Sequence, residues 1–172
     1  MSGVVWITGL PASGKTTLAR ALIEELEARA LRATLIDSDE ARTHLTPQAT
    51  YSAHERTMVY RAMAYAARRL AEQGVIVVVA ATTHSKALRD EARAIVPQML
   101  LVHARCPLAE CKRRDPKGLF LAAHADAHGS MPGVHVDYEE PVDADATIDT
   151  FDTVRVSDLN AIVERVIDAA PR

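Results

Sequence analysis

Residues 9–16 read Gly9-Leu10-Pro11-Ala12-Ser13-Gly14-Lys15-Thr16 and fit the pattern G-x-x-x-x-G-K-[ST]. The run Val4-Val5-Trp6-Ile7 before them is short, apolar and rich in β-forming residues, so it predicts a strand. From Thr17 to Ala30, apolar side chains recur at helical spacing. A glycine turn between a strand and the start of a helix forms a cradle whose free backbone N–H groups point at a phosphate.

The residue types in this loop favour a nucleoside triphosphate, in particular ATP. Lys15 is placed to reach the β- and γ-phosphates, and the hydroxyl of Thr16 is placed to hold Mg²⁺. The alternative is a glycine turn that binds no ligand, and the flanking strand and helix argue against it. The ATP-binding residues expected here are Gly9, Pro11, Ala12, Ser13, Gly14, Lys15, Thr16 and Thr17.

The composition is that of an ordinary globular domain, and we expect residues 1–172 to form one domain. The chain is 48% hydrophobic and 25% charged. Its formal net charge of −3 argues against nonspecific binding to nucleic acid or to an anionic membrane. No apolar run approaches the roughly 20 residues of a membrane span, and the first strand begins too early for a signal peptide. Cys106 and Cys111 form no disulfide framework, so we expect free thiols in a reducing cytoplasm.

Apolar strand-like runs alternate with helical patterns along most of the chain, which predicts an α/β fold with a parallel sheet. Further strands are expected at 33–36, 75–79, 99–104 and 146–148, and further helices at 51–73, 85–95, 107–114 and 157–169. In the long helix Ser52 is the expected N-cap, with Glu55 at the capping-box position and Gly74 closing the helix. Ser157 is expected to cap the last helix. Residues 115–141 are rich in Gly, Pro, His and charge, and we expect a mobile covering segment there.

Two carboxylates, Asp37 and Asp39, follow the second strand, at the edge where ligands gather in parallel α/β sheets. One carboxylate there can accept a proton from an attacking hydroxyl or hold Mg²⁺ through water. The competing interpretation is structural, because Asp-Ser-Asp is also good helix-capping sequence. Their expected position beside the phosphate loop favours the functional interpretation.

The chain lacks the marks of other phosphate-loop proteins. It contains no guanine-specific Asn-Lys-x-Asp run. The strand at 75–79 is followed by Ala80-Ala81, without the acidic residue with which motor ATPases hold magnesium. The short length, the Asp-x-Asp and the late basic segment indicate a small-molecule kinase.

The chain resembles adenylylsulfate (APS) kinase over nearly its whole length. The most specific match is Cys-Lys-Arg-Arg-Asp-Pro-Lys-Gly-Leu-Phe at 111–120, which is close to the lid run of that family. Asp37-Ser38-Asp39-x-x-Arg42 resembles its Asp-Gly-Asp-x-x-Arg, and Tyr51-Ser52-x-x-Glu55-Arg56 is similar to its Phe-Ser-x-x-Asp-Arg. The strand and loop 6–10, Tyr138-Glu139-x-Pro141 and Asp149-Thr150 fit as well. The resemblance implies a three-layer α/β/α P-loop NTPase fold with a mainly parallel five-stranded sheet and a lid at about 115–141.

By this resemblance the chain uses ATP and Mg²⁺ to phosphorylate the 3′-hydroxyl of adenosine 5′-phosphosulfate, and it forms a homodimer. Asp39 resembles the base that faces the hydroxyl, while Asp37 and Thr16 support Mg²⁺. Arg42 and Arg56 resemble a clamp on the substrate's anionic end, which planar guanidinium groups suit. The other implied positions are Tyr51, stacked on the substrate base; Lys117, near the transferred phosphoryl group; Leu119 and Met131, at the acceptor; and Arg114 and Thr150, at ATP.

Three departures from the family pattern fall on the acceptor side. Val59 stands in place of an Asn, Thr82-Thr83-His84 in place of Ile-Ser-Pro, and Met131-Pro132-Gly133 in place of Phe-Thr-Gly. A site that loses a hydrogen-bonding side chain changes its selectivity. The departures therefore leave open another nucleotide-like acceptor, such as a cytidine diphosphate derivative used in polysaccharide or natural-product synthesis. A non-catalytic ATP-binding switch or subunit is a further alternative, against which the intact Lys15 and Asp39 argue.

Two other clusters give weaker signals. His124, His128 and His135 are close in sequence, but a zinc site needs a fourth ligand and a stable helix, which this segment does not promise. The basic residues at 112–114 and 117 lack an aromatic platform, so we assign them to ATP phosphates rather than to nucleic acid.

Overall fold

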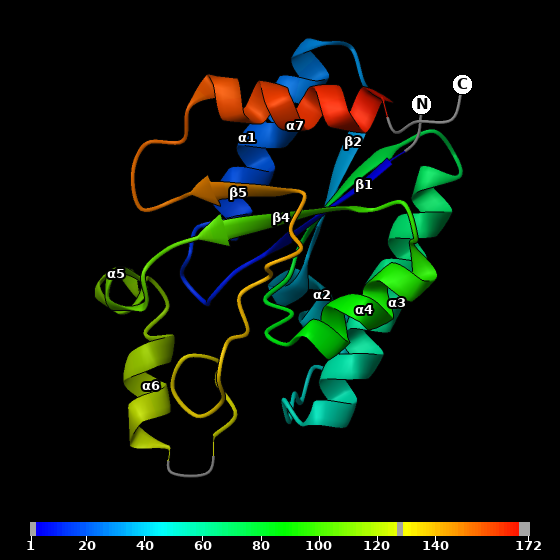
Figure 1. Cartoon of the computed structure of the whole chain (residues 1–172). Coiled ribbons are helices and arrows are strands. Elements are labelled where there is room, and N and C mark those ends of the chain that lie inside the picture. The colour runs from blue at the N-terminus through cyan, green and yellow to red at the C-terminus, as the bar shows by residue number, and fades with distance from the viewer. Residues whose placement is uncertain (1–2, 127–128, 169–172) are drawn as a thin grey trace.

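A five-stranded sheet runs through the centre of the protein in the computed structural model, which describes residues 3–126 and 129–168 (Figure 1). The strands are β1 (Gly3–Thr8), β2 (Ala33–Asp37), β3 (Ile76–Ala80), β4 (Leu100–Arg105) and β5 (Ala146–Asp149). Their order in the sheet is β2-β3-β1-β4-β5, and every pair is parallel. The predicted α/β fold with a parallel five-stranded sheet is confirmed.

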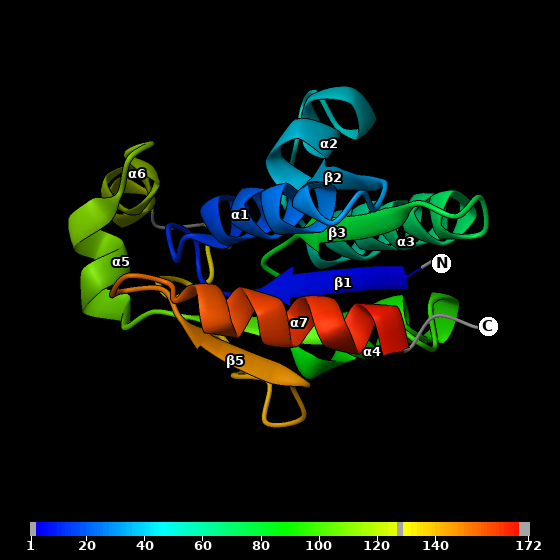
Figure 2. The same ribbon diagram turned by 90° about the horizontal axis from the view of Figure 1, so that it is seen from above.

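Helices cover both faces of the sheet and the edge where its strands end. They are α1 (Lys15–Ala28), α2 (Ser38–Leu45), α3 (Ala53–Ala71), α4 (Lys86–Ile95), α5 (Leu108–Arg114), α6 (Leu119–Ala125) and α7 (Val156–Asp168). Figure 2 shows α1 and α7 along one face, α2 beside β2, and α5 with α6 beyond the ends of the strands. No helix of the described ranges combines the length and the apolar character needed to cross a bilayer.

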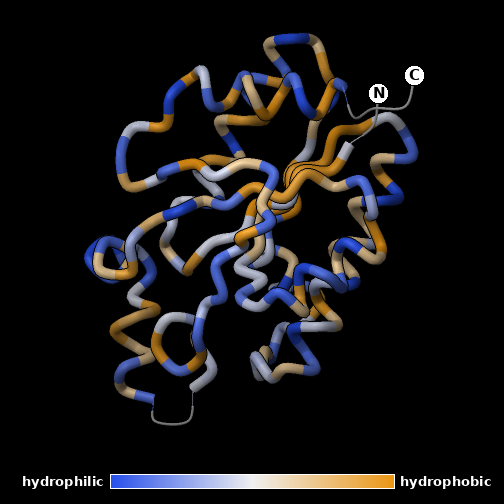
Figure 3. Tube along the Cα trace, viewed as in Figure 1, coloured by the Kyte–Doolittle hydropathy of each residue, from blue (hydrophilic) through white to orange (hydrophobic). Residues whose placement is uncertain are grey.

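The central strands are apolar on both faces because each face is covered by helices. In β3, every residue from Ile76 to Ala80 is buried. On one face, Trp6 and Val77 pack with α3 residues such as Met63. On the other face, Ile7 and Val78 pack with α1 and α7. Figure 3 shows hydrophobic colour in the central strands and hydrophilic colour on the outer parts of the helices.

The strand register brings the predicted site segments to one edge of the sheet. Ala80, at the end of β3, pairs with Ile7 of β1 and with Asp37 of β2. The phosphate loop, Asp37 and the β3–α4 turn therefore leave the sheet side by side. This is the carboxyl edge, where parallel α/β sheets bind their ligands.

Most predicted elements are present, with their ends shifted by one or two residues, and the predicted N-cap of the long helix is confirmed. The Ser52 hydroxyl accepts a hydrogen bond from the N–H of Glu55. The last helix begins at Val156, so Ser157 lies inside it and the expected cap there is wrong. We did not expect α2, because Asp-Ser-Asp indicated only a cap or a turn. The stretch 115–141 also contains a helix, α6, which was hidden by the Gly- and Pro-rich composition around it.

Candidate active site

The phosphate loop depends on glycine at two positions for different reasons. A Cβ on Gly9 would lie 2.5 Å from Ser13 Oγ and 2.6 Å from the Ala104 carbonyl oxygen, so a larger residue does not fit. Gly14 precedes α1 with φ of +86°, in the left-handed region that side chains disfavour. The loop is thus wound tightly around the helix start, as a phosphate cradle requires.

Polar groups in this loop are arranged for a ligand. The buried Ser13 Oγ has no hydrogen-bond partner among the described residues. Lys15 Nζ donates to two carbonyl oxygens of its own loop, 3.1 Å from that of Gly9 and 2.7 Å from that of Leu10. Burial lowers the pKa of Lys15 to about 8, although Asp39 and Asp37 pull in the opposite direction. Phosphate oxygens suit such a cation, so the loop fits ATP.

Thr16 and Asp37 form the part of the site that suits Mg²⁺. Thr16 Oγ1 donates a 2.6 Å hydrogen bond to Asp37 Oδ2, while Asp37 Oδ1 accepts the N–H of Asp39 at 2.8 Å. Asp37 is therefore the N-cap of α2, which confirms the structural interpretation, and its contact with Thr16 leaves the predicted functional role compatible with the cap. These oxygens are the hard ligands that Mg²⁺ prefers, and bound there it would neutralise phosphate charge.

The far side of the loop is closed by Arg114 and Thr150, both predicted at ATP. Thr150 Oγ1 donates to the Ser13 carbonyl oxygen at 2.5 Å, and Arg114 Nη1 donates to the Thr150 carbonyl oxygen at 2.9 Å. Glu110 holds the other side of the Arg114 guanidinium, 2.7 Å from Nε. The structure thus brings to the loop one residue from the end of α5 and one from just after β5.

The predicted base and lid lysine are in direct contact. Lys117 Nζ lies 2.5 Å from Asp39 Oδ2, although 78 residues separate the two in sequence. Both side chains are more than half exposed. The hydrogen bond to Asp39 raises the pKa of Lys117, so the lysine is charged at neutral pH.

The predicted arginine clamp is assembled around Tyr51. The Arg42 and Arg56 guanidinium groups lie 4.8 Å and 5.4 Å from the centre of the Tyr51 ring. Arg42 donates from Nη1 to Glu55 Oε1 at 2.8 Å, while its buried Nη2 has no hydrogen-bond partner in the described part of the chain. Arg56 Nη2 donates to the Ser130 carbonyl oxygen at 2.8 Å, which ties the covering segment to α3.

Glu55 and Ser130 contact the two arginines of the predicted clamp, and the sequence did not single out either residue for that role. Glu55 does more than complete a capping box, since its carboxylate accepts the N–H groups of Thr50 and Tyr51 as well as Arg42. Mainly the Thr50 N–H lowers the pKa of Glu55 to about 2. These bonds fix the segment before α3, in which Tyr51 has φ of +53° and a side chain that is 46% exposed. The acid at the capping-box position was the available signal for Glu55.

The remaining predicted positions lie in the lid, in the phosphate loop and at the start of α1. Met131 packs against a small cluster that contains Cys106, Cys111 and Phe120. Leu119 begins α6 with an exposed side chain, Thr17 is exposed on α1, and Ala12 has φ of +59° in the loop. The two cysteines are free, as predicted.

The histidine cluster is only partly described, because His128 lies outside the described residues. His135 uses both ring nitrogens within its own segment. Its Nδ1 accepts the Met131 N–H at 3.0 Å, and its Nε2 lies 2.7 Å from the Asp126 carbonyl oxygen. Among the described residues there is no group of three or more His, Cys, Asp or Glu side chains arranged for a metal ion.

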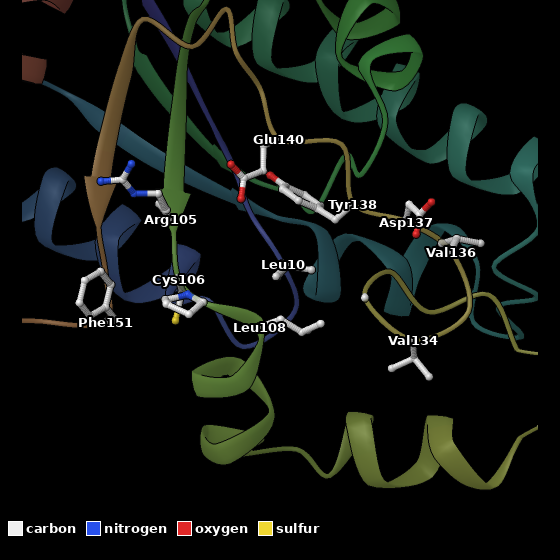
Figure 4. Close-up of a pocket in the computed structure, with 12 residues that line it drawn as sticks. Leu10, Arg105, Cys106, Leu108, Val134, Val136, Asp137, Tyr138, Glu140 and Phe151 are labelled. Atoms are coloured by element: carbon white, nitrogen blue, oxygen red, sulfur yellow. The ribbon is translucent and has the colours of Figure 1, made fainter.

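A pocket lies next to the phosphate loop but not inside the cradle (Figure 4). It is bordered by Leu10 at the loop tip, by Arg105 and Phe151 at the ends of β4 and β5, and by Tyr138 and Glu140 near the end of the covering segment. Arg105 already forms an ion pair with Asp149, 2.5 Å from Nε to Oδ1. The described residues that line this pocket do not include the lysine or threonine of the phosphate loop.

The comparison with known families decides which kinase this is. The family model for adenylylsulphate kinase matches residues 1–149. The chain belongs to the adenylylsulphate kinase family. The predicted family is thereby confirmed, and the chain is an ATP-dependent kinase that phosphorylates a hydroxyl group.

Known members of the adenylylsulphate kinase family resemble the chain over most of its length. The Archaeoglobus fulgidus protein named probable adenylyl-sulfate kinase is 39% identical over 150 residues, which cover 87% of this chain and 97% of that one. The adenylyl-sulfate kinase of Shewanella amazonensis is 35% identical over 167 residues, covering 96% and 82%. The structure of the Mycobacterium tuberculosis APS kinase CysC in complex with AMPPNP and APS matches 98% of this chain and 96% of its own, with a TM-score of 0.85 at 28% identity.

Proposed function

We propose that this member of the adenylylsulphate kinase family transfers the γ-phosphoryl group of MgATP to the 3′-hydroxyl of adenosine 5′-phosphosulfate. The products are ADP and 3′-phosphoadenosine 5′-phosphosulfate. The observation that carries the proposal is the placement of α2. Its N-cap Asp37 contacts Thr16 of the phosphate loop, Asp39 contacts the lid lysine, and Arg42 enters the arginine clamp. One short helix therefore joins the ATP half of the site to the acceptor half.

In the proposed reaction, Asp39 accepts the proton of the 3′-hydroxyl as the 3′-oxygen bonds to the γ-phosphorus. The bond from the γ-phosphorus to the β–γ bridging oxygen breaks, and ADP leaves. Lys15 and Lys117 hold negative charge on the transferred group, and such enzymes act mainly by positioning and charge neutralisation. A carboxylate base contributes about 10²–10⁴ in rate.

Arg42, Arg56 and Tyr51 are proposed to bind the acceptor. Arg42 and Arg56 are buried; Arg42 forms an ion pair with Glu55, whereas Arg56 donates to the Tyr51 and Ser130 carbonyl oxygens and to the Ser130 hydroxyl. Two guanidinium groups stand against this one carboxylate, so one positive charge is not neutralised. An anion suits that charge and the unpartnered Nη2 of Arg42. The half-exposed Tyr51 ring between them offers a face on which a nucleotide base can stack.

The segment 115–141 is proposed to act as a lid over both substrates. It already supplies Lys117 to Asp39 and Ser130 to Arg56. Closure of this lid excludes water, which would otherwise accept the phosphoryl group.

The test is ADP release from ATP with and without APS, followed by mass spectrometry of the product. Acceleration by APS, with one phosphate added at the 3′-position, supports the proposal. Slow ATP hydrolysis whose rate does not rise with any acceptor would indicate an ATP-binding switch or subunit instead.

A second acceptor class is favoured by one observation, the polar character of the β3–α4 turn. Thr82 and His84 are partly exposed polar residues of this turn, while the hydroxyl of the buried Thr83 is bonded to β1. The second candidate is a kinase of this family that acts on another nucleotide-like hydroxyl compound, such as a cytidine diphosphate derivative. The rate of ADP release by such a kinase would not rise with APS. It would respond to such a compound in the same ADP-release assay.

We also propose that the chain acts as a homodimer in the cytoplasm. Two buried cysteines that remain free suit a reducing compartment. Light scattering coupled to size exclusion tests the dimer, and a monomer mass at assay concentration would contradict it.

A further inference from the structure

The turn between β3 and α4 is held by several buried hydrogen bonds at Thr83. Thr83 is fully buried and has φ of +32°. Its Oγ1 accepts the indole N–H of Trp6 at 3.3 Å and donates to Thr8 Oγ1 at 2.9 Å. Its carbonyl oxygen accepts from Arg89 Nη1 at 3.0 Å. Two elements, β1 and α4, thus fix one residue in a conformation that non-glycine residues disfavour.

This clamped turn places His84 at the carboxyl edge of the sheet, where the charge of Arg56 from the proposed clamp acts on its ring. The turn leaves the sheet beside Asp37, because Ala80 pairs with Asp37 in the register. The His84 carbonyl oxygen accepts the N–H of Glu139 at 2.8 Å, so the end of the covering segment is tied to the same turn. The strain lies at Thr83, so the buried bonds of that residue fix the direction in which the backbone enters the next residue, His84.

The His84 ring has a polar atom without a partner. Its Nδ1 is buried and has no hydrogen-bond partner among the described residues. Burial, and then the positive charge of Arg56, lowers the pKa of His84; Arg89 acts in the same direction and Glu139 opposes them. A buried polar atom left without a partner costs free energy, so such an atom at a site commonly marks a ligand contact.

We propose that His84 is an acceptor-binding residue whose Nδ1–H donates a hydrogen bond to the anionic group held by Arg56. The inference rests on the proposed function, because it takes Arg56 as part of the clamp for a phosphate or sulfate group. An anionic oxygen accepts from several donors at once, so a neutral N–H adds directional contact beside two guanidinium groups. His84 thereby selects for an acceptor with an anionic oxygen at this point.

The kinetic test uses three variants of histidine. His84→Ala removes the donor, and we expect the KM for APS to rise roughly 10- to 100-fold while the KM for ATP stays within about threefold. His84→Asn places an amide donor near the position of Nδ1, so it should recover most of the lost acceptor affinity. His54→Ala, at an exposed position in the first turn of α3, is the matched control and should behave like the unmodified chain. Equal KM values for APS in the unmodified chain and His84→Ala would overturn the inference.

A spectroscopic test separates this inference from the proposed function. With AMPPNP bound, addition of APS should shift the ¹⁵N resonance of His84 Nδ1, and Arg56→Met should weaken the shift. If APS is not phosphorylated, the proposed function fails, and the same titration is then made with inorganic sulfate. A sulfate-dependent shift at His84 that is lost in Arg56→Met still supports an anion contact. A His84 resonance that moves with neither APS nor sulfate contradicts the inference whatever the kinase activity.

Discussion

The ammonium nitrogen of Lys117 lies 2.5 Å from Oδ2 of Asp39, and this contact joins the covering segment to α2. The side chains are 59% and 62% exposed, so the pair stabilises the fold by no more than about 1 kcal/mol. A weak, exposed pair can open when substrates arrive. Under the proposed function, Lys117 then turns to the transferred phosphoryl group, and Asp39 becomes free to accept the proton.

The first prediction concerns the proposed base. Asp39→Asn should lower kcat by about 10²–10⁴ because the amide cannot accept the hydroxyl proton. Its Kd for ATP, measured by calorimetry with a non-hydrolysable analogue, should stay within about threefold because the phosphate loop is intact. Glu40→Gln, at an exposed carboxylate on the same helix, serves as the control and should keep its activity. Near-normal turnover of Asp39→Asn would exclude the base role.

The second prediction concerns the pH dependence of ATP binding. The pKa of Lys15 is lowered from 10.5 to about 8, so its ammonium loses the proton as the pH rises through 8. Bound phosphates favour the charged form, so affinity is highest below pH 8 and falls above it. At pH 9 the Kd for ATP should be about tenfold higher than at pH 7. Lys15→Met should bind weakly at both values, and equal affinities of the unmodified chain at pH 7 and pH 9 would contradict the assignment.

The third prediction compares two glycines. Gly9→Ala should lower the free energy of unfolding by about 1–3 kcal/mol and abolish ATP binding, since its Cβ would meet Ser13 Oγ and the Ala104 carbonyl. Gly118→Ala has open space around the new Cβ, but its φ of +64° costs about 1–2 kcal/mol. It should therefore be destabilised yet bind ATP normally. Urea unfolding and analogue binding distinguish the two, and loss of ATP binding in both variants would argue against a specific packing effect at Gly9.

The fourth prediction concerns Glu55 and acid stability. The Thr50 N–H, with further help from Arg42, lowers the pKa of Glu55 from 4.5 to about 2. A depressed carboxyl pKa stabilises the fold above pH 4.5, and this contribution is lost as the pH falls through 2. The stability difference between the unmodified chain and Glu55→Gln should thus be largest near pH 7 and shrink toward pH 3 in urea unfolding.

The control for this prediction is Glu72→Gln. Glu72 is also a carboxylate on an arginine pair, but it lies at the exposed end of α3. Its substitution should change stability little at any pH. A difference for Glu55→Gln that is constant from pH 7 to pH 3 would mean that its carboxylate is not the titrating contact.

The local sequence predicted the phosphate loop and the strands because their signals lie within a few consecutive residues. A glycine turn flanked by β-branched residues and a helical repeat needs no distant partner to be recognised. The local sequence did not predict α2, because its mostly polar residues lack the apolar repeat at helical spacing that indicates a helix. The local sequence also did not predict that Glu55 pairs with Arg42. The capping pattern already accounts for an acidic residue at position 55, so it does not require an arginine 13 residues away.

The sequence by itself determined the family, the α/β fold and the ATP half of the site, since these depend on short motifs and on hydrophobic period. Only the tertiary structure decided how the acceptor half is built. Arg56 meets Ser130 across 74 residues, and Thr83 meets Trp6 across 77. Such contacts depend on how the helices pack on the sheet. That packing brings together side chains that are far apart in the sequence, and no local pattern predicts which of them will meet. His84 is a candidate contact for the same reason, because its buried, unpartnered ring nitrogen and the charge of Arg56 come together only in the folded chain.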